Sequence, residues 1–168
     1  MKYIVIMTTI NICGEEVASN VGYLCLSNKQ LTSLPPEIGK LEKLEVLDLS
    51  YNKLTSLPKE IGKLGNLNYL FLFNNHLTSL PKGFLKLKSI EVLYLSGNQL
   101  ISLPKGIGNL KNLVYLGLEN NQLTSLPAEI GNLEKLEYLY LSDNPIPEVE
   151  IKKIKELLPN CIILNDYE

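Results

Sequence analysis

Leucines recur along most of this chain in one frame that repeats every 23 residues. The repeat is plainest in a short motif, which reads Leu-Thr-Ser-Leu-Pro from Leu31, Leu54, Leu77 and Leu123, and Leu-Ile-Ser-Leu-Pro from Leu100. Full copies of the frame L-x-x-L-x-L-x-x-N-x-L-x-x-L-P-x-x-I-G-x-L-x-x begin at Val21, Leu44, Leu67, Ile90 and Leu113, and a partial sixth copy runs from Leu136 to Pro145. This self-similarity predicts a stack of structural units that bury their apolar faces on one another.

The first half of each copy alternates apolar and polar positions. Within residues 44–50, two leucines point to one face, while Val46, Asp48 and Ser50 point to the other, which is the period of a short strand. Stacked copies then predict a parallel sheet. The second half of each copy contains Pro and Gly between its apolar residues, which predicts turns with short 3₁₀ or α-helical pieces.

This frame resembles the leucine-rich repeat family, and the 23-residue period is similar to that of bacterial members, including proteins of pathogenic spirochaetes. The resemblance covers roughly residues 21–146. It implies an α/β solenoid, a horseshoe arc with a parallel β-sheet on its concave face and short helical turns on its convex face. It also implies a binding role, with a host-facing bacterial adhesin or effector as the expectation by analogy.

Both ends of the chain depart from the repeat, as the caps of a solenoid must. Residues 147–158 predict a helix, because its apolar residues Ile151, Ile154, Leu157 and Leu158 fall on one side. Residues 161–164 predict a last strand. The N-terminal region predicts a β-type cap with strands at 3–7 and 8–12 and a break at 14–16. The expected organisation is an N-terminal cap at 1–20, repeats at 21–146 and a C-terminal cap at 147–168.

An asparagine occupies the same column after five of the expected strands, at Asn52, Asn75, Asn98, Asn121 and Asn144. An amide side chain both donates and accepts hydrogen bonds, which suits a bend where backbone groups lack sheet partners. The family resemblance implies a structural asparagine ladder in this column. The first copy has Lys29 in the column and Asn28 one place early, which predicts a reshaped turn.

Aromatic residues gather on the outward columns of the strands. Nine of the twelve aromatics fall there, namely Tyr23, Tyr51, Tyr69, Phe71, Phe73, Tyr94, Tyr115, Tyr138 and Tyr140. Two interpretations remain open, since the rings either pack across neighbouring strands or form a protein-binding patch. Phe71 and Phe73 favour the patch, because two exposed phenylalanines on one strand gain little from water. The expected partner-binding set is these aromatics other than Tyr51, together with Asp48 and Glu119.

Candidate chemistry is scarce. The only histidine, His76, occupies a variable turn position, and the carboxylates fall in different columns and copies. We therefore expect no enzyme activity, no cofactor and no metal site. A net charge of -2 and a pI of about 5.6 argue against nucleic acid or an anionic membrane as partner. Acidic residues on the concave rim slightly favour a basic partner.

Cys13, Cys25 and Cys161 are far apart in the sequence, which predicts free thiols rather than a disulfide framework. No segment reads as a convincing signal peptide or membrane span, so localisation stays open between secretion or the cell surface, by analogy, and the cytoplasm. The leading interpretation is a non-enzymatic module that binds a protein or peptide through its concave face. The alternative is a scaffold or self-associating module that forms a homodimer through residues 2–12.

Overall fold

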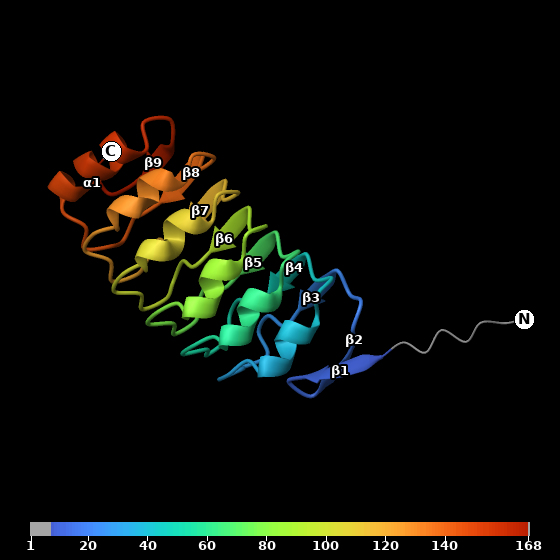
Figure 1. The fold of residues 1–168 in the computed structure, drawn as a ribbon. Coiled ribbons are helices and arrows are strands. Elements are labelled where there is room, and N and C mark those ends of the chain that lie inside the picture. The colour runs from blue at the N-terminus through green and yellow to red at the C-terminus, as the bar shows by residue number, and fades with distance from the viewer. Residues whose placement is uncertain (1–7, 168) are drawn as a thin grey trace, which may run out of the picture.

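Seven parallel strands form one sheet along a solenoid of stacked coils. The computed structural model describes residues 8–167, and Figure 1 shows the coils following one another from the N-terminal hairpin to the C-terminal helix. Strand order in the sheet equals chain order. The strands are β3 (Tyr23–Cys25), β4 (Val46–Asp48), β5 (Tyr69–Phe71), β6 (Val92–Tyr94), β7 (Tyr115–Gly117), β8 (Tyr138–Tyr140) and β9 (Ile162–Leu164). The predicted parallel sheet is confirmed.

The register of the sheet aligns equivalent residues of successive coils. Leu47 of β4 lies opposite Leu70 of β5, and Leu70 lies opposite Leu93 of β6. Each coil therefore places its inward leucine beside that of the next coil, and its outward residues form continuous columns. The last pair differs, because the C-terminal helix intervenes and brings Ile163 opposite Leu139.

The convex side carries five short 3₁₀ helices, as the Pro and Gly pattern predicted. They are η1 (Pro36–Lys40), η2 (Lys59–Lys63), η3 (Lys82–Lys86), η4 (Lys105–Asn109) and η5 (Ala128–Asn132). Each follows a proline with an extended backbone, such as Pro58 with φ -67° and ψ 147°. Each ends within two turns, and the N–H of the next leucine bonds back into the helix, as Leu64 does to the carbonyl of Ile61.

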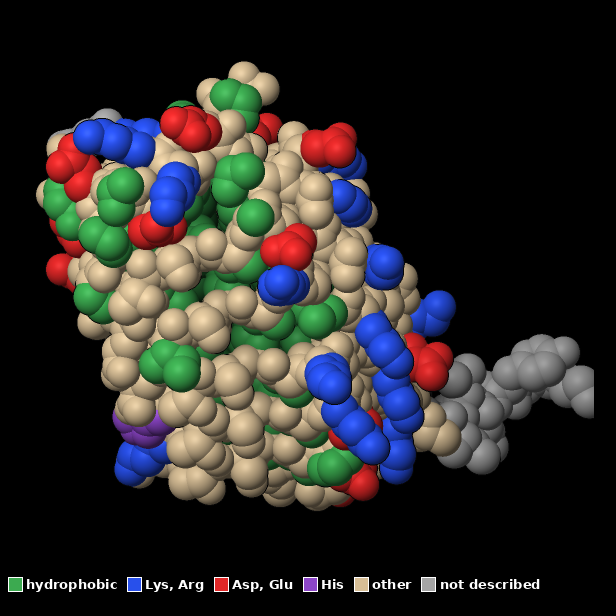
Figure 2. Space-filling view, turned by 60° about the vertical axis from the view of Figure 1, so that its left-hand side comes forward, with side chains coloured by type: hydrophobic (Ala, Val, Ile, Leu, Met, Phe, Trp, Pro, Cys, Tyr) green, Lys and Arg blue, Asp and Glu red, His purple; other side chains and the backbone are tan. Residues whose placement is uncertain are grey.

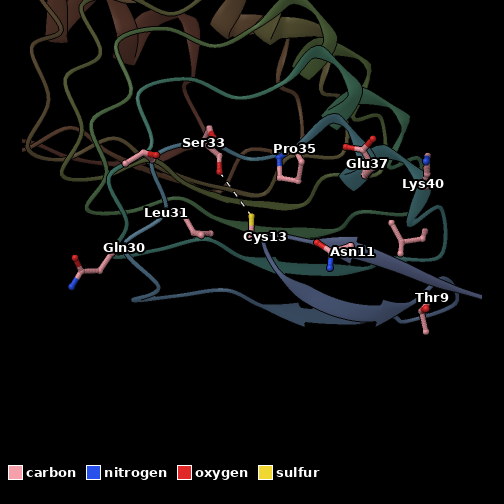
Figure 3. A pocket seen from close by; sticks show the side chains of 11 residues that line it. Thr9, Asn11, Cys13, Gln30, Leu31, Ser33, Pro35, Glu37 and Lys40 are labelled. Atoms are coloured by element: carbon pink, nitrogen blue, oxygen red, sulfur yellow. Dashed lines mark hydrogen bonds between the residues drawn. The ribbon is translucent and has the colours of Figure 1, made fainter.

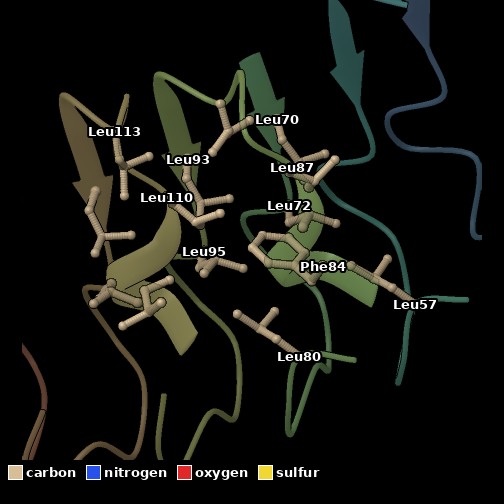
Figure 4. Close-up of a cluster of buried hydrophobic side chains, with 14 of the residues drawn as sticks. Leu57, Leu70, Leu72, Leu80, Phe84, Leu87, Leu93, Leu95, Leu110 and Leu113 are labelled. Carbon is tan, nitrogen blue, oxygen red and sulfur yellow. The ribbon is translucent and has the colours of Figure 1, made fainter. Parts of the chain in front are cut away.

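Leucines from both halves of the coils meet in a continuous core. Figure 4 shows Phe84 of η3 pointing among the leucines of neighbouring coils, including Leu72 and Leu95. The Phe84 side chain is fully buried, and it fills a position that most other coils give to isoleucine. Burial of one such side chain stabilises the fold by about 1.5–3 kcal/mol, so the core is the main source of stability.

The C-terminal end is closed by a helix and a strand. Helix α1 (Glu148–Leu157) lies at the end of the arc in Figure 1, and β9 follows it as the last strand of the sheet. The predicted helix is confirmed, with Ile151 and Ile154 buried. One detail differs from the prediction: Leu157, the last residue of the helix, is 40% exposed. Its side chain lies beside η5, where a Cβ added at Gly131 would be 3.3 Å from the Cβ of Leu157.

The N-terminal end is covered by a β-hairpin. Strand β1 (Thr9–Ile12) pairs antiparallel with β2 (Glu15–Ala18), and Cys13 and Gly14 make the turn with φ of 53° and 88°. Positive φ at both turn residues is the geometry that suits the twist of a two-residue hairpin. Ile12 and Val17 are buried against the first coil.

The expected break at 14–16 was therefore only partly right. Gly14 does turn the chain, but the two glutamates after it belong to β2. The predicted strand at 3–7 lies outside the described residues, and so does most of the segment 2–12 proposed for dimerisation. Within the described part, β1 pairs only with β2, so the outer edge of β1 carries no strand.

Candidate protein-binding face

The asparagine column lies buried where each strand ends. The Nδ2 of Asn98 donates to the carbonyls of Leu72 and Leu95, each at 2.9 Å, and its Oδ1 accepts the N–H of Leu77 at 2.9 Å. Asn75, Asn121 and Asn144 make the equivalent bonds in their own coils. Each asparagine thus ties its own coil to the preceding one. Because these bonds satisfy buried backbone groups, the column shapes the face without belonging to it.

The first turn has the different shape that its sequence suggested. Both Asn28 and Gln30 adopt positive φ, whereas each later turn has a single such residue. Because Lys29 occupies the asparagine column of the first copy, the Oδ1 of Asn52 accepts two backbone N–H groups, from Lys29 at 3.1 Å and from Leu31 at 2.9 Å. The asparagine of the second coil therefore serves the first turn as well.

Seven aromatic rings make a connected network on the outward side of the sheet, which we call the aromatic cluster. Its members are Tyr51, Phe71, Phe73, Tyr94, Tyr115, Tyr138 and Tyr140. Tyr94 is central, with ring centroids 5.4 Å from Phe71, 6.3 Å from Phe73 and 4.6 Å from Tyr115. Tyr23 and Tyr69 lie in the same columns but contact no other ring among residues 8–167. The structure thus separates two of the predicted binding residues from the rest.

The expectation of two bare phenylalanines was wrong. Phe71 and Phe73 are both half-buried, because Phe71 stacks on Tyr94 and Phe73 meets Tyr51 edge to face at 5.0 Å. The most exposed rings are instead Tyr23, at 62%, and Tyr51, at 57%. Packing and surface display therefore coexist in the aromatic cluster, and the two interpretations of the sequence do not exclude each other.

Gly117 makes room for the centre of the aromatic cluster. It lies in register between Tyr94 and Tyr140, and the ring of Tyr115 lies 4.6 and 4.8 Å from the rings of those two residues. A Cβ on Gly117 would lie 3.2 Å from the Tyr94 ring, tighter than an ordinary contact. Burial, together with hydrogen bonds to Tyr94 and Tyr140, raises the pKa of Tyr115 well above its usual range. The rings of these three tyrosines thus form one packed patch.

Two apolar residues of the face lie outside the predicted binding set. Ile162 and Leu164 of β9 lie in register with Tyr138 and Tyr140, so they extend both outward columns into the cap. Their side chains are 55% and 42% exposed. The signal was present in the apolar run at 162–164, but its register depended on the length of the intervening helix.

The two predicted carboxylates lie beside the rings and accept hydrogen bonds from serines. Asp48 lies in register with Phe71 and accepts the backbone N–H of Ser50 at 2.9 Å and also its hydroxyl. Glu119 accepts the hydroxyl of Ser96. Both carboxylates are only partly exposed, so they are oriented by the scaffold rather than free to rotate.

A separate groove of about 850 Å³ lies between the N-terminal hairpin and the first coil. Figure 3 shows Thr9, Asn11 and Cys13 on the hairpin side, facing residues of the first coil from Gln30 to Lys40. The Cys13 thiol contacts the carbonyl of Ser33 at 3.9 Å. Burial, followed by the nearby charge of Glu15, raises the pKa of the Cys13 thiol.

The thiols are free and differ in surroundings. Hydrogen bonds from Ser27 lower the pKa of the exposed Cys25, whereas burial raises the pKa of Cys161 to about 11. His76 is exposed, with its Nδ1 3.5 Å from the amide nitrogen of Gln99. No group of three or more metal-binding side chains occurs among residues 8–167. Within the same residues, no helix combines the length and the apolar character needed to cross a bilayer.

The fold, the repeated register and the asparagine column define a leucine-rich repeat protein. Family models agree along most of the chain: a leucine-rich repeat region matches residues 19–102, and two leucine-rich repeat models match residues 88–146 and 135–162. The chain belongs to the leucine-rich repeat family. Domains of this family are typically protein–protein interaction modules without enzymatic activity.

Solved structures place this chain among bacterial members of the family. A leucine-rich repeat protein of Leptospira interrogans is 42% identical over 80% of this chain, with a TM-score of 0.66. An internalin of Listeria monocytogenes is 25% identical over 81% of this chain, with a TM-score of 0.67. This chain spans 40% and 38% of the lengths of those two proteins. Among proteins with curated descriptions, none matches.

Proposed function

We propose that this chain binds a protein or peptide through the outward face of its sheet, centred on the aromatic cluster, and that it performs no catalysis. The observation that carries the proposal is the network of seven rings on a face that the core does not require. The inward leucines already fill the core, while aromatic side chains with polar tips are the ones that dominate protein interfaces.

The size of the face supports the same proposal. Seven strands at the usual spacing of about 4.8 Å span roughly 29 Å. With the adjoining turns, such a face offers about 800 Å² to one partner, which is the scale of a standard interface. The similarity to the Leptospira and Listeria proteins supports a bacterial protein whose partner belongs to a host, as part of this proposal.

Differential capture from host-cell and bacterial extracts tests the proposal. The bait is the native chain beside a triple variant with Phe71→Ser, Phe73→Ser and Tyr94→Ser. The matched control is Ile101→Ser, because Ile101 is 63% exposed and lies in a turn outside the sheet face. Circular dichroism and thermal melting confirm that each bait is folded at the working temperature.

A partner retained by the native chain and by Ile101→Ser, but lost by the triple variant, supports binding through the aromatic cluster. Equal capture by all three folded baits refutes it. Self-association through residues 2–12 stays an alternative prediction. A chain without residues 1–12 that has half the native mass in light scattering supports that alternative, and an unchanged monomeric mass removes it.

A further inference from the structure

The rim of the sheet face has a period of two coils. The residue directly before each of the six strands β3 to β8 is, in chain order, Gly22, Glu45, Asn68, Glu91, Val114 and Glu137. A glutamate thus stands at every second coil. The next column shows tyrosines at the same interval in its first five coils, with Tyr23, Tyr69 and Tyr115 in the coils between, and the alternation ends at Tyr138, which follows Glu137 directly. The fold needs only a 23-residue repeat, so this longer period belongs to the surface.

The three rim glutamates are free to meet a ligand. Glu45, Glu91 and Glu137 are all exposed, and within residues 8–167 their carboxylates make no ion pair or hydrogen bond. Their backbones are held in place, since the carbonyl of Glu91 accepts the N–H groups of Val114 at 2.8 Å and Tyr115 at 3.0 Å. The carboxylates therefore project from fixed positions.

Charge is divided between the faces of the molecule. The six segments that form the sheet face, residues 22–28 and their equivalents up to 137–143, contain no lysine, arginine or histidine. They contain six acidic residues, which are Glu45, Asp48, Glu91, Glu119, Glu137 and Asp143. Lysines lie in the other parts of the coils, and Figure 2 shows Lys side chains gathered along one flank. A face with carboxylates, aromatic rings and no cation is complementary to a basic segment.

The spacing of the rim glutamates matches the repeat of a polyproline II helix and not that of a β-strand. Neighbouring strands are about 4.8 Å apart, so glutamates two coils apart are about 9.6 Å apart. A polyproline II helix has three residues per turn and rises about 3.1 Å per residue. Every third side chain therefore points in the same direction, at a spacing of about 9.3 Å. In a β-strand, successive side chains point to opposite faces. Residues three positions apart would therefore point alternately toward the sheet face and away from it.

We propose, building on the binding role proposed above, that the sheet face recognises a polyproline II segment with lysine or arginine at every third position. Its basic residues pair with Glu45, Glu91 and Glu137, and its proline rings lie on Tyr69, Tyr115 and the aromatic cluster. Aromatic-lined surfaces suit this conformation because its backbone is already extended and loses little entropy on binding.

Titration of synthetic peptides against the whole chain, followed by fluorescence anisotropy, tests this inference. The probe has three Lys-Pro-Pro units, so its first and last lysines are about 19 Å apart, matching the about 19 Å from Glu45 to Glu137. A second peptide has the same composition with its lysines grouped at one end. A third peptide replaces each lysine with glutamate.

Variants of the chain complete the test. Combined substitution of Glu45→Gln, Glu91→Gln and Glu137→Gln removes three exposed charge pairs, and we expect affinity for the Lys-Pro-Pro peptide to fall about tenfold. Glu156→Gln is the single-charge control, because Glu156 is exposed on helix α1, away from the sheet face. We expect it to leave affinity unchanged, and we expect added salt to weaken binding of the native chain.

Preference of the native chain for the spaced peptide over the grouped peptide, together with the loss in the triple glutamine variant, supports the inference. Equal binding of the spaced and grouped peptides overturns it, as does unchanged affinity in a folded triple glutamine variant or no binding at all. The peptide experiments can fail without contradicting the proposed function. Aromatic-dependent capture of a partner without binding of this peptide leaves the proposed function standing and removes only the inference.

Discussion

The ring of Phe71 stacks on the ring of Tyr94 in the next strand, with centroids 5.4 Å apart and planes inclined by 24°. This contact joins neighbouring coils on the solvent side of the sheet, opposite the leucine core. Phe71 is therefore only half exposed, and its ring contributes to stability as well as to the surface. A substitution here changes both properties, and they need separate measurements.

Phe71→Ser is expected to lower the free energy of unfolding by about 1–2 kcal/mol, because it removes a partly buried ring and its stacking contact. Urea denaturation followed by circular dichroism measures the change. Tyr69→Ser is the matched control on the same strand, since Tyr69 contacts no other ring and should cost clearly less. Equal losses for the two variants would show that the stacking contact contributes nothing to stability.

Asn121→Ala is expected to lower the free energy of unfolding by about 2–4 kcal/mol, because it leaves buried backbone groups without partners. The amide of Asn121 donates to the carbonyls of Leu95 at 3.0 Å and Leu118 at 2.9 Å, and accepts the N–H of Leu100 at 3.0 Å. Gln122→Ala, at the next and exposed position, should change stability by less than about 0.5 kcal/mol. Chemical denaturation of both variants checks the difference, and similar midpoints would contradict it.

Gly83→Ala is expected to destabilise the chain by about 2–4 kcal/mol, because a Cβ at Gly83 would lie 2.0 Å from the carbonyl oxygen of Lys59 in the preceding coil. The two 3₁₀ helices would have to move apart. Gly65→Ala is the control, since a Cβ there meets nothing within 4 Å. Thermal melting compares the two. A Gly83→Ala chain as stable as the Gly65→Ala chain would mean that the convex turns separate at little cost.

The three thiols should react in a fixed order. The lowered pKa of Cys25 gives it the largest thiolate fraction near pH 8, and its side chain is exposed. The pKa of Cys161 is raised to about 11, so its alkylation should be slowest and should keep accelerating as the pH rises toward that value. Iodoacetamide labelling read by peptide mass spectrometry gives the order. Faster labelling of Cys161 than of Cys25 at pH 8 would contradict these surroundings.

The repeat made most of the fold predictable from the sequence. Alternation around Leu47 and Leu49 gave the strand and its inward face, and one correct coil predicts the others because they stack in the same register. Helix α1 could be predicted because its apolar residues recur with the period of an α-helix, which differs from the pattern of apolar residues within the coils. The β-hairpin at the N-terminus was predicted less accurately. Glu15 and Glu16 are residue types common in loops, and only their pairing with β1 shows that they belong to a strand.

For the candidate face, the sequence predicted which residues form each outward column, but not how their side chains pack. The sequence predicted which side of the sheet Phe71 occupies. It did not predict that the ring of Tyr94 would stack on Phe71, because ring orientation depends on side-chain torsion angles. The gap at Gly117 and the rings that close over it are also features of packing between coils. Ile162 and Leu164 were not placed on the face because their register does not follow the repeat: Ile162 pairs with Tyr138, which lies 24 residues earlier rather than 23.

Because the rim glutamates alternate, the repeating unit of the backbone is one coil, whereas the repeating unit of the rim is a pair of coils. Insertion or loss of a single coil preserves the leucine register and the asparagine bonds, so the backbone continues undisturbed. The same event changes the spacing between rim glutamates and shifts every later one out of phase. Only coils gained or lost in pairs keep the alternation of the rim glutamates. A protein of this kind can therefore lengthen in steps of 23 residues as a scaffold, but only in steps of 46 as a recognition surface.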